Sequence, residues 1–227
     1  MLQRIEIHLI AKILLAIGLL CLIIVIHATG HSENLILKVP AEFSILDPLT
    51  VGSGFCHTSS THMYGNLFGF MLAVPAVLLL QPVWVLPTAF LFSCWTGSLA
   101  HVFWLQFQDQ PVTQLCGASG GVYGLLAVAL LSTFKLEPLC YKLCLPTLYS
   151  FIILASYLST SSDENISLAA HIGGLFGGLV IGFLAELVRL FLKMAFKRDR
   201  IGYSLLHYDS LPRQSNRDDS AWEIITA

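Results

Sequence analysis

GASGGVYG, residues 117–124, is a glycine-rich stretch that places Ser119 at the start of an apolar segment running to Phe134. Small residues on both sides of the hydroxyl predict a closely packed, polar entry into a hydrophobic helix. A second stretch, AHIGGLFGGLVIGF at residues 170–183, places His171 in a similar position. A serine and a histidine at matching positions of two small-faced helices suggest a nucleophile and its general base.

The composition of the whole chain indicates a polytopic membrane protein. The 227 residues have a mean hydropathy of +0.74, and only 11% of them are charged, against roughly a quarter in soluble domains. The formal net charge of −2 provides no basic field for nucleic acid. We therefore expect the lipid bilayer, and no nucleic acid, as the surroundings of the chain.

Six apolar segments follow one another along the chain, at residues 13–28, 62–80, 83–104, 117–134, 143–159 and 168–192. The first could be a signal peptide, but residues 27–30 make a poor cleavage site, so a retained helix is favoured. Pro75 predicts a kink in the second segment. We expect an all-α, six-span membrane domain at residues 1–193 and a polar, disordered cytoplasmic tail at residues 194–227.

The distribution of basic residues predicts the orientation. Eleven of the twelve lysines and arginines lie in the amino terminus, the loop at residues 135–142 or the carboxyl-terminal part, which leaves only Lys38 on the other side. The positive-inside rule then predicts that both termini are cytoplasmic. As the location of the protein, we favour the plasma membrane or the secretory pathway. The second, fourth and sixth segments would all enter the membrane from its outer face.

Glycine spacing predicts that the segments of Ser119 and His171 approach closely. His171 shares a stripe with Gly174, Gly178 and Gly182, and the fourth segment offers two G-x-x-x-G pairs, Gly117 with Gly121 and Gly120 with Gly124. Ser119 and His171 could then form a hydrogen-bonded dyad. The alternative is that both residues only hydrogen-bond between helices to stabilise the fold.

Further polar residues fall at the same depth. Asn66, with His62 four residues earlier, could donate hydrogen bonds to an oxyanion, and Tyr123 lies one turn after Ser119. Asn66 could equally be an interhelical contact, and His57 an ordinary interfacial histidine. The nearest acidic residues, Asp163 and Glu164, lie in a loop at least seven residues before His171, so we expect no carboxylate third member.

The six cysteines lie in or beside apolar segments without metal-ligand spacing. We interpret them mainly as free thiols that pack as small hydrophobes. A disulfide between Cys56 and Cys116 is the alternative, because both fall in loops on the predicted outer side. No metal and no organic cofactor is expected.

Three motifs in this order resemble the rhomboid intramembrane serine proteases: GASG around Ser119, AHIGG around His171, and His57, His62 and Asn66 separated by four and three residues. The resemblance covers residues 10–192 and implies a six-helix bundle. It implies that Ser119 of the G-x-S-G motif beginning at Gly117 is the nucleophile and that His171 is the base. It also implies that His62 and Asn66 contribute to the oxyanion hole and that Tyr123 packs on the base. Rhomboids often carry a Trp-Arg pair in the first outer loop, and residues 30–61 have neither residue type.

The resemblance implies an intramembrane endopeptidase that cleaves single-span membrane proteins at or near the outer membrane face. An inactive rhomboid-like protein that binds membrane clients for trafficking or degradation is the alternative, although such relatives typically lose the serine or the histidine. A channel or transporter is disfavoured, since no inverted repeat or charged pore-lining series is visible. The sequence does not indicate an oligomeric state.

Overall fold

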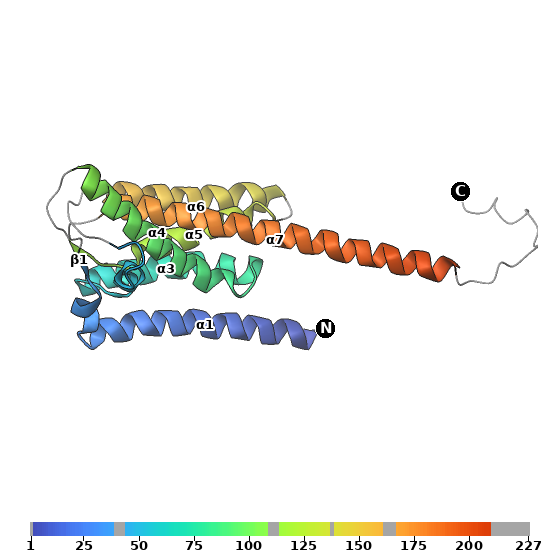
Figure 1. Ribbon diagram of the computed structural model, residues 1–227, viewed down its shortest axis with the longest axis horizontal. Helices are drawn as coiled ribbons and strands as arrows, with labels where there is room; N and C mark the ends of the chain where they lie inside the picture. Colours follow the sequence, from blue (N-terminus) through green and yellow to red (C-terminus); the bar gives the residue numbers. More distant parts are fainter. Residues whose placement is uncertain (1, 39–43, 109–113, 137–138, 161–166, 210–227) are drawn as a thin grey trace, which may run out of the picture. The chain divides into compact units, whose positions relative to one another are not determined.

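The computed structural model describes the backbone of residues 2–38, 44–108, 114–136, 139–160 and 167–209, and this part of the chain is almost entirely helical (Figure 1). It divides into two compact units, Met1–Glu186 and Leu187–Ala227, which we describe separately. The long helices are α1 (Leu2–Ala28), α3 (Ser60–Leu80), α4 (Val85–Phe107), α5 (Ser119–Thr133), α6 (Leu139–Thr160) and α7 (Leu168–Asp209). Between them lie the short elements η1 (His31–Leu35), β1 (Leu37–Lys38), α2 (Leu49–Gly52), η2 (Ser53–Phe55) and β2 (Gln114–Leu115).

The expected all-helical class is confirmed, and every apolar segment of the sequence falls on a long helix. Four stretches are long and apolar enough to cross a membrane, namely Leu9–Ala28, Ser60–Leu80, Val85–Phe107 and Leu168–Ala195. Two shorter apolar helices, Ser119–Thr133 and Cys144–Ser156, accompany them. These helices identify the chain as an integral membrane protein. That it crosses the membrane six times stays a prediction.

Helix α5 occupies the middle of the first unit. Its residues from Gly120 to Ala129 are all buried. Helices α3, α4 and α6 pack around it. A helix that is apolar on every face is buried, either in a protein core or in a membrane, and here its neighbouring helices supply much of the cover. Helices α3, α4 and α7 expose large apolar side chains such as Phe68, Phe103 and Phe176, which suit contact with lipid.

The segment between α1 and α3 is anchored to α4 and to the strand before α5. β1 pairs antiparallel with β2, with Leu37 opposite Leu115. The Ser98 hydroxyl of α4 donates to the Thr50 carbonyl at 2.7 Å, and Trp95 Nε1 donates to the Ile45 carbonyl at 3.1 Å. These contacts hold the first loop in place in a chain that has no Trp-Arg pair there.

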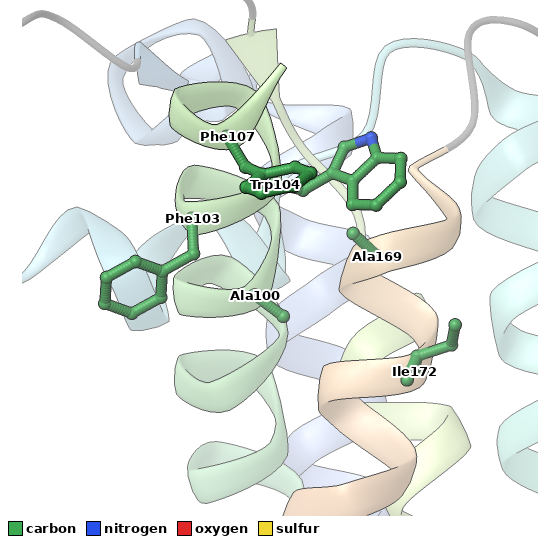
Figure 2. Close-up of a pocket in the computed structure, with 6 residues that line it drawn as sticks. All are labelled: Ala100, Phe103, Trp104, Phe107, Ala169 and Ile172. Atoms are coloured by element: carbon green, nitrogen blue, oxygen red, sulfur yellow. The ribbon is translucent and has the colours of Figure 1, made fainter. Parts of the chain in front are cut away.

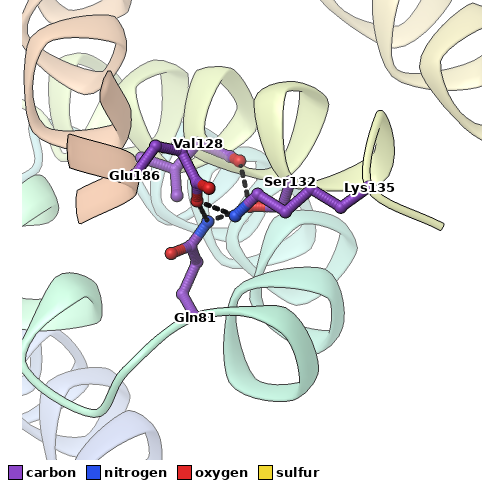
Figure 3. A network of polar contacts seen from close by, with 5 residues as sticks. All are labelled: Gln81, Val128, Ser132, Lys135 and Glu186. Atoms are coloured by element: carbon purple, nitrogen blue, oxygen red, sulfur yellow. Dashed lines mark hydrogen bonds and ion pairs between the residues drawn. The ribbon is translucent and has the colours of Figure 1, made fainter. Parts of the chain in front are cut away.

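A polar cluster joins the helices at the opposite end of the first unit (Figure 3). Gln81, directly after α3, donates from Nε2 to the Ser132 hydroxyl of α5 at 2.7 Å. Lys135 forms an ion pair with Glu186 of α7. The ammonium of Lys12 in α1 donates to the carbonyls of Leu78 and Gln81 at 2.7 and 2.8 Å. This cluster, which the sequence analysis did not predict, satisfies carbonyls at the carboxyl-terminal end of α3 that would otherwise lack partners.

Pro75 lies inside α3, which ends at Leu80 as expected, and the kink at this proline stays a prediction. One helix differs from expectation. In the second unit α7 continues to Asp209, past the expected end of the last segment at Leu192. Residues 210–227 of the predicted tail lie outside the described residues.

Candidate active site

Ser119 and His171, which are 52 residues apart in the sequence, are joined by a hydrogen bond. Ser119 is the first residue of α5, and its Oγ lies 2.8 Å from Nε2 of His171. His171 is in the first turn of α7 and is only 4% exposed. With the imidazole proton on Nδ1, the Ser119 hydroxyl donates to Nε2, which is the arrangement that a general base needs.

Glycines bring the backbones of α5 and α7 into direct contact beside this pair. A Cβ at Gly174 would overlap the carbonyl oxygen of Gly120, and one at Gly178 would overlap that of Gly124. Of the two G-x-x-x-G pairs in the sequence, therefore, Gly120 and Gly124 are the pair whose backbones contact α7. Gly121 instead faces Phe90 of α4, where a Cβ would lie 2.6 Å from two ring carbons.

The first turn of α7 is held by hydrogen bonds to Ser167. The Ser167 hydroxyl accepts from the Ala170 amide at 3.1 Å and lies 2.7 Å from Nδ1 of His101 in α4. On the next turn Thr96 of α4 donates to the Gly173 carbonyl at 2.8 Å. His101 is buried and was not singled out by the sequence analysis. These contacts set the depth at which His171 meets Ser119.

Tyr123 covers the face of the imidazole of His171. The two rings stack with centroids 4.5 Å apart and planes 13° from parallel. Tyr123 lies one turn after Ser119 on α5 and is itself buried. The stack restricts rotation of the imidazole and shields one of its faces from water.

Asn66 and His57 form a second buried pair next to the start of α5. Asn66 Nδ2 lies 2.9 Å from Nε2 of His57, and the Ala118 amide donates to the same nitrogen at 3.4 Å. Both contacts require Nε2 of His57 to be an acceptor. The amide nitrogen of Asn66 carries two N–H groups, and the contact with His57 uses only one of them. The sequence analysis left His57 as a possible interfacial residue, although it is part of the motif with His62 and Asn66.

The environment of His57 keeps it neutral. Burial, followed by the nearby His62 and His27, lowers the pKa of His57 to about 3. A neutral ring leaves a lone pair on Nε2 for the Asn66 and Ala118 donors. His57 therefore positions Asn66, and its own buried Nδ1 has no hydrogen-bond partner among the described residues.

His62 and Gly117 are in contact, and Asn66 lies beside them. A Cβ at Gly117 would lie 2.6 Å from Cε1 of His62 and 3.8 Å from Nδ2 of Asn66. Gly117 also has a φ of 138°, which side chains strongly disfavour. A glycine is thus required at position 117, where the chain enters α5 next to the potential hydrogen-bond donors His62 and Asn66.

Nothing in the described part of the chain hydrogen-bonds to Nδ1 of His171. Asp163 and Glu164, the carboxylates nearest to it in the sequence, lie outside the described residues. The described residues also contain no cluster of three metal-ligating side chains. The chemistry available from the described groups is that of a hydroxyl and an imidazole with nearby N–H donors.

An apolar groove lies beside the start of α7, between this helix and α4 (Figure 2). Trp104 reaches from α4 over the start of α7, where Ala169 lies. The groove is lined by Ala100, Phe103, Trp104, Phe107, Ala169 and Ile172. No titratable side chain lines it, so it offers no group for bond cleavage.

A comparison with known protein families matches the region that contains Ser119, His171, His57 and Asn66. A family model described as Rhomboid domain matches residues 49–186. Rhomboid-like protease 5 of Toxoplasma gondii is 28% identical to this chain over 169 residues. The alignment covers 64% of this chain and 20% of that protein, so the chain spans about a fifth of the length of the curated relative it matches.

Proposed function

The chain belongs to the rhomboid family, and we propose that it is an active intramembrane serine endopeptidase with Ser119 as nucleophile and His171 as general base. The single observation that supports this proposal best is the 2.8 Å contact between Ser119 Oγ and His171 Nε2. A hydroxyl and an imidazole at this distance, in a water-poor setting, suit acyl transfer. Among the described residues, no two carboxylates lie together in a way that would offer an alternative acid–base pair for hydrolysis.

In the proposed reaction Ser119 Oγ attacks the carbonyl carbon of the scissile peptide bond while His171 Nε2 accepts its proton. The imidazolium then gives this proton to the leaving amine, and a water molecule hydrolyses the acyl-enzyme by the same two transfers. The developing oxyanion would accept hydrogen bonds from the free N–H of Asn66 and from the Ser119 amide at the positive end of α5. His62, in contact with Gly117, is a further donor for this charge.

The proposed substrates are single-span membrane proteins, cut at or near the outer membrane face. A peptide bond inside a stable helix has its carbonyl occupied, so the substrate must unwind locally before attack. We propose six spans with both termini cytoplasmic, a membrane domain at residues 1–193 and a cytoplasmic tail at residues 194–227. The exposed apolar faces of α3, α4 and α7 support lateral access from the bilayer.

The test is reaction with a fluorophosphonate probe together with cleavage of a single-span reporter in liposomes. Ser119→Ala and His171→Ala should each abolish both signals while the protein stays folded, because nucleophile and base act as a unit. A matched control is Ser156→Ala, in α6 and outside the site. If the wild-type chain fails to react with the probe and still binds single-span proteins, the inactive client-binding alternative replaces the proposal.

A further inference from the structure

Two cysteines far apart in the sequence meet beside the start of α5. The side chains of Cys56 and Cys116 lie close enough for each to influence the ionisation of the other. Cys56 directly precedes His57, and Cys116 directly precedes Gly117. The thiols thus lie where the segment before α3 touches the segment before α5.

The backbone around the two thiols is held independently of them. The carbonyl of Ser53 accepts from the Gly117 amide at 2.9 Å and lies 3.2 Å from Sγ of Cys56, which donates to it. The Ala118 amide donates to His57 Nε2. Because the residues next to both cysteines are fixed by these contacts, the two sulfur atoms stay close together in the folded chain.

We propose that Cys56 and Cys116 form a reversible disulfide that covalently joins the segment before α3 to the segment before α5. Cys116 is partly exposed, whereas Cys56 is fully buried at 0% exposed. This difference assigns the roles, since an external oxidant reaches only Cys116. Cys56 then resolves the first product from inside the protein.

The electrostatics of the pair agree with these roles. The neighbouring Cys56 thiol lowers the pKa of the Cys116 thiol against the opposing effect of partial burial, and the Thr58 backbone amide also lowers it. The neighbouring Cys116 thiol, followed by burial, raises the pKa of Cys56. Cys116 is also the partly exposed thiol of the two, so its thiolate is the one placed to act as the nucleophile in disulfide exchange.

The oxidant is a low-molecular-weight disulfide of the glutathione type. The Cys116 thiolate attacks one of its sulfur atoms, a mixed disulfide forms, and one small thiolate leaves. That thiolate takes the proton of Cys56, and the Cys56 thiolate attacks Sγ of Cys116 and displaces the second small thiolate. Two protein thiols lose two electrons in total, and the small disulfide gains them as two small thiols.

The other described cysteines are not placed for this exchange. Cys94 is buried within α4, and Cys21 and Cys144 are exposed on α1 and α6. Cys140 has no described side chain. The bridge would hold Gly117, and with it the start of α5, against His57 and Asn66. Its formation does not depend on proteolysis, so its test is separate from that of the proposed function.

The experiment equilibrates the purified full-length chain in detergent with reduced and oxidised glutathione. After an acid quench and alkylation, peptides are mapped by mass spectrometry without reduction. We expect a linked Cys56–Cys116 peptide pair that dithiothreitol separates. Cys56→Ala should trap glutathione on Cys116, and Cys116→Ser should leave Cys56 unmodified. The control Cys21→Ser/Cys144→Ser should form the same linked pair as wild type.

A thermal melt distinguishes a bridge between the two segments from incidental oxidation. Because a crosslink restricts the unfolded chain, the oxidised wild type should melt several degrees above the reduced form, and Cys116→Ser should show no such difference. A missing linked peptide at every glutathione ratio, stable glutathionylation of wild-type Cys116, or equal melting temperatures would each overturn the proposal.

Discussion

Replacing Gly174 by alanine is expected to slow the reaction of Ser119 by about a hundredfold while leaving every proposed reactive group in place. Gly174 lies three residues after His171 on α7, and its nearest neighbour is Gly120, directly after Ser119 on α5. The substitution adds one methyl group between the two helices that carry the dyad. Its effect therefore reports on the distance between them.

The magnitude follows from the contacts of the added methyl group. A Cβ at Gly174 would overlap the Gly120 carbonyl oxygen and lie 2.7 Å from both its carbonyl carbon and its Cα. Carbon atoms in contact prefer about 3.5–4.0 Å, so α7 must withdraw by about 1 Å. The obstructing atoms are backbone, and no rotamer change relieves the overlap. The contact between Ser119 Oγ and His171 Nε2, now 2.8 Å, would lengthen toward about 3.8 Å, beyond a hydrogen bond.

The assay is the second-order rate constant for fluorophosphonate labelling of Ser119 in detergent, on variants shown to be folded by a cooperative melt. Gly18→Ala in α1 is the matched control, because nothing lies within 4 Å of its added methyl group. Gly182→Ala should fall between the two, since its nearest neighbour is the flexible end of Leu131 at 2.9 Å. Labelling of Gly174→Ala within about twofold of wild type would refute the reasoning, which predicts about a hundredfold loss.

Three further predictions concern other residues. Asn66→Ala should lower kcat by roughly tenfold to a thousandfold with little change in KM, because an oxyanion donor binds the transition state more tightly than the substrate. An unchanged kcat with a lower melting temperature would make Asn66 a structural contact only. Glu186→Gln should destabilise the fold by about 1–3 kcal/mol, because it removes the charge that pairs with Lys135. Denaturation measures this loss, and Ser119 labelling of the folded fraction should stay unchanged. The folded chain lowers the pKa of His57 to about 3. Between about pH 6.5 and 3, therefore, His57 is protonated in the unfolded chain and neutral in the folded chain. The melting temperature should therefore fall as pH decreases through this window, and His57→Gln should show a flatter profile.

Most of the helical pattern could be predicted from the sequence. The expected segments at residues 62–80 and 83–104 became α3 (Ser60–Leu80) and α4 (Val85–Phe107). The agreement is this close because a membrane helix is defined by a local property, a run of apolar residues bounded by polar ones. The family was likewise predicted from short motifs around Ser119 and His171. The number of spans and the roles of the site residues stay predictions.

The partners of individual residues were harder to predict. The sequence offered two G-x-x-x-G pairs in one segment, and only the structure assigns Gly120 and Gly124 to α7. The buried roles of His57 and His101 were missed, because a histidine near a helix end is ambiguous until its neighbours are known. The ion pair between Lys135 and Glu186 was also missed. The sequence analysis used Lys135 only to predict the orientation of the chain, and it did not consider Glu186.

By itself, then, the sequence determined that this protein is helical, belongs in a membrane and carries a serine and a histidine at equivalent helix starts. These properties follow from composition and short-range spacing, which are local properties that can be read from each segment separately. Only the tertiary structure decided which face of α5 meets α7, that Asn66 is held by His57, and that Cys56 meets Cys116. The physical reason is that a helix packs on several neighbours at once. Which of its faces meets which neighbour depends on the combined shape of all of them, and short-range spacing does not contain that information.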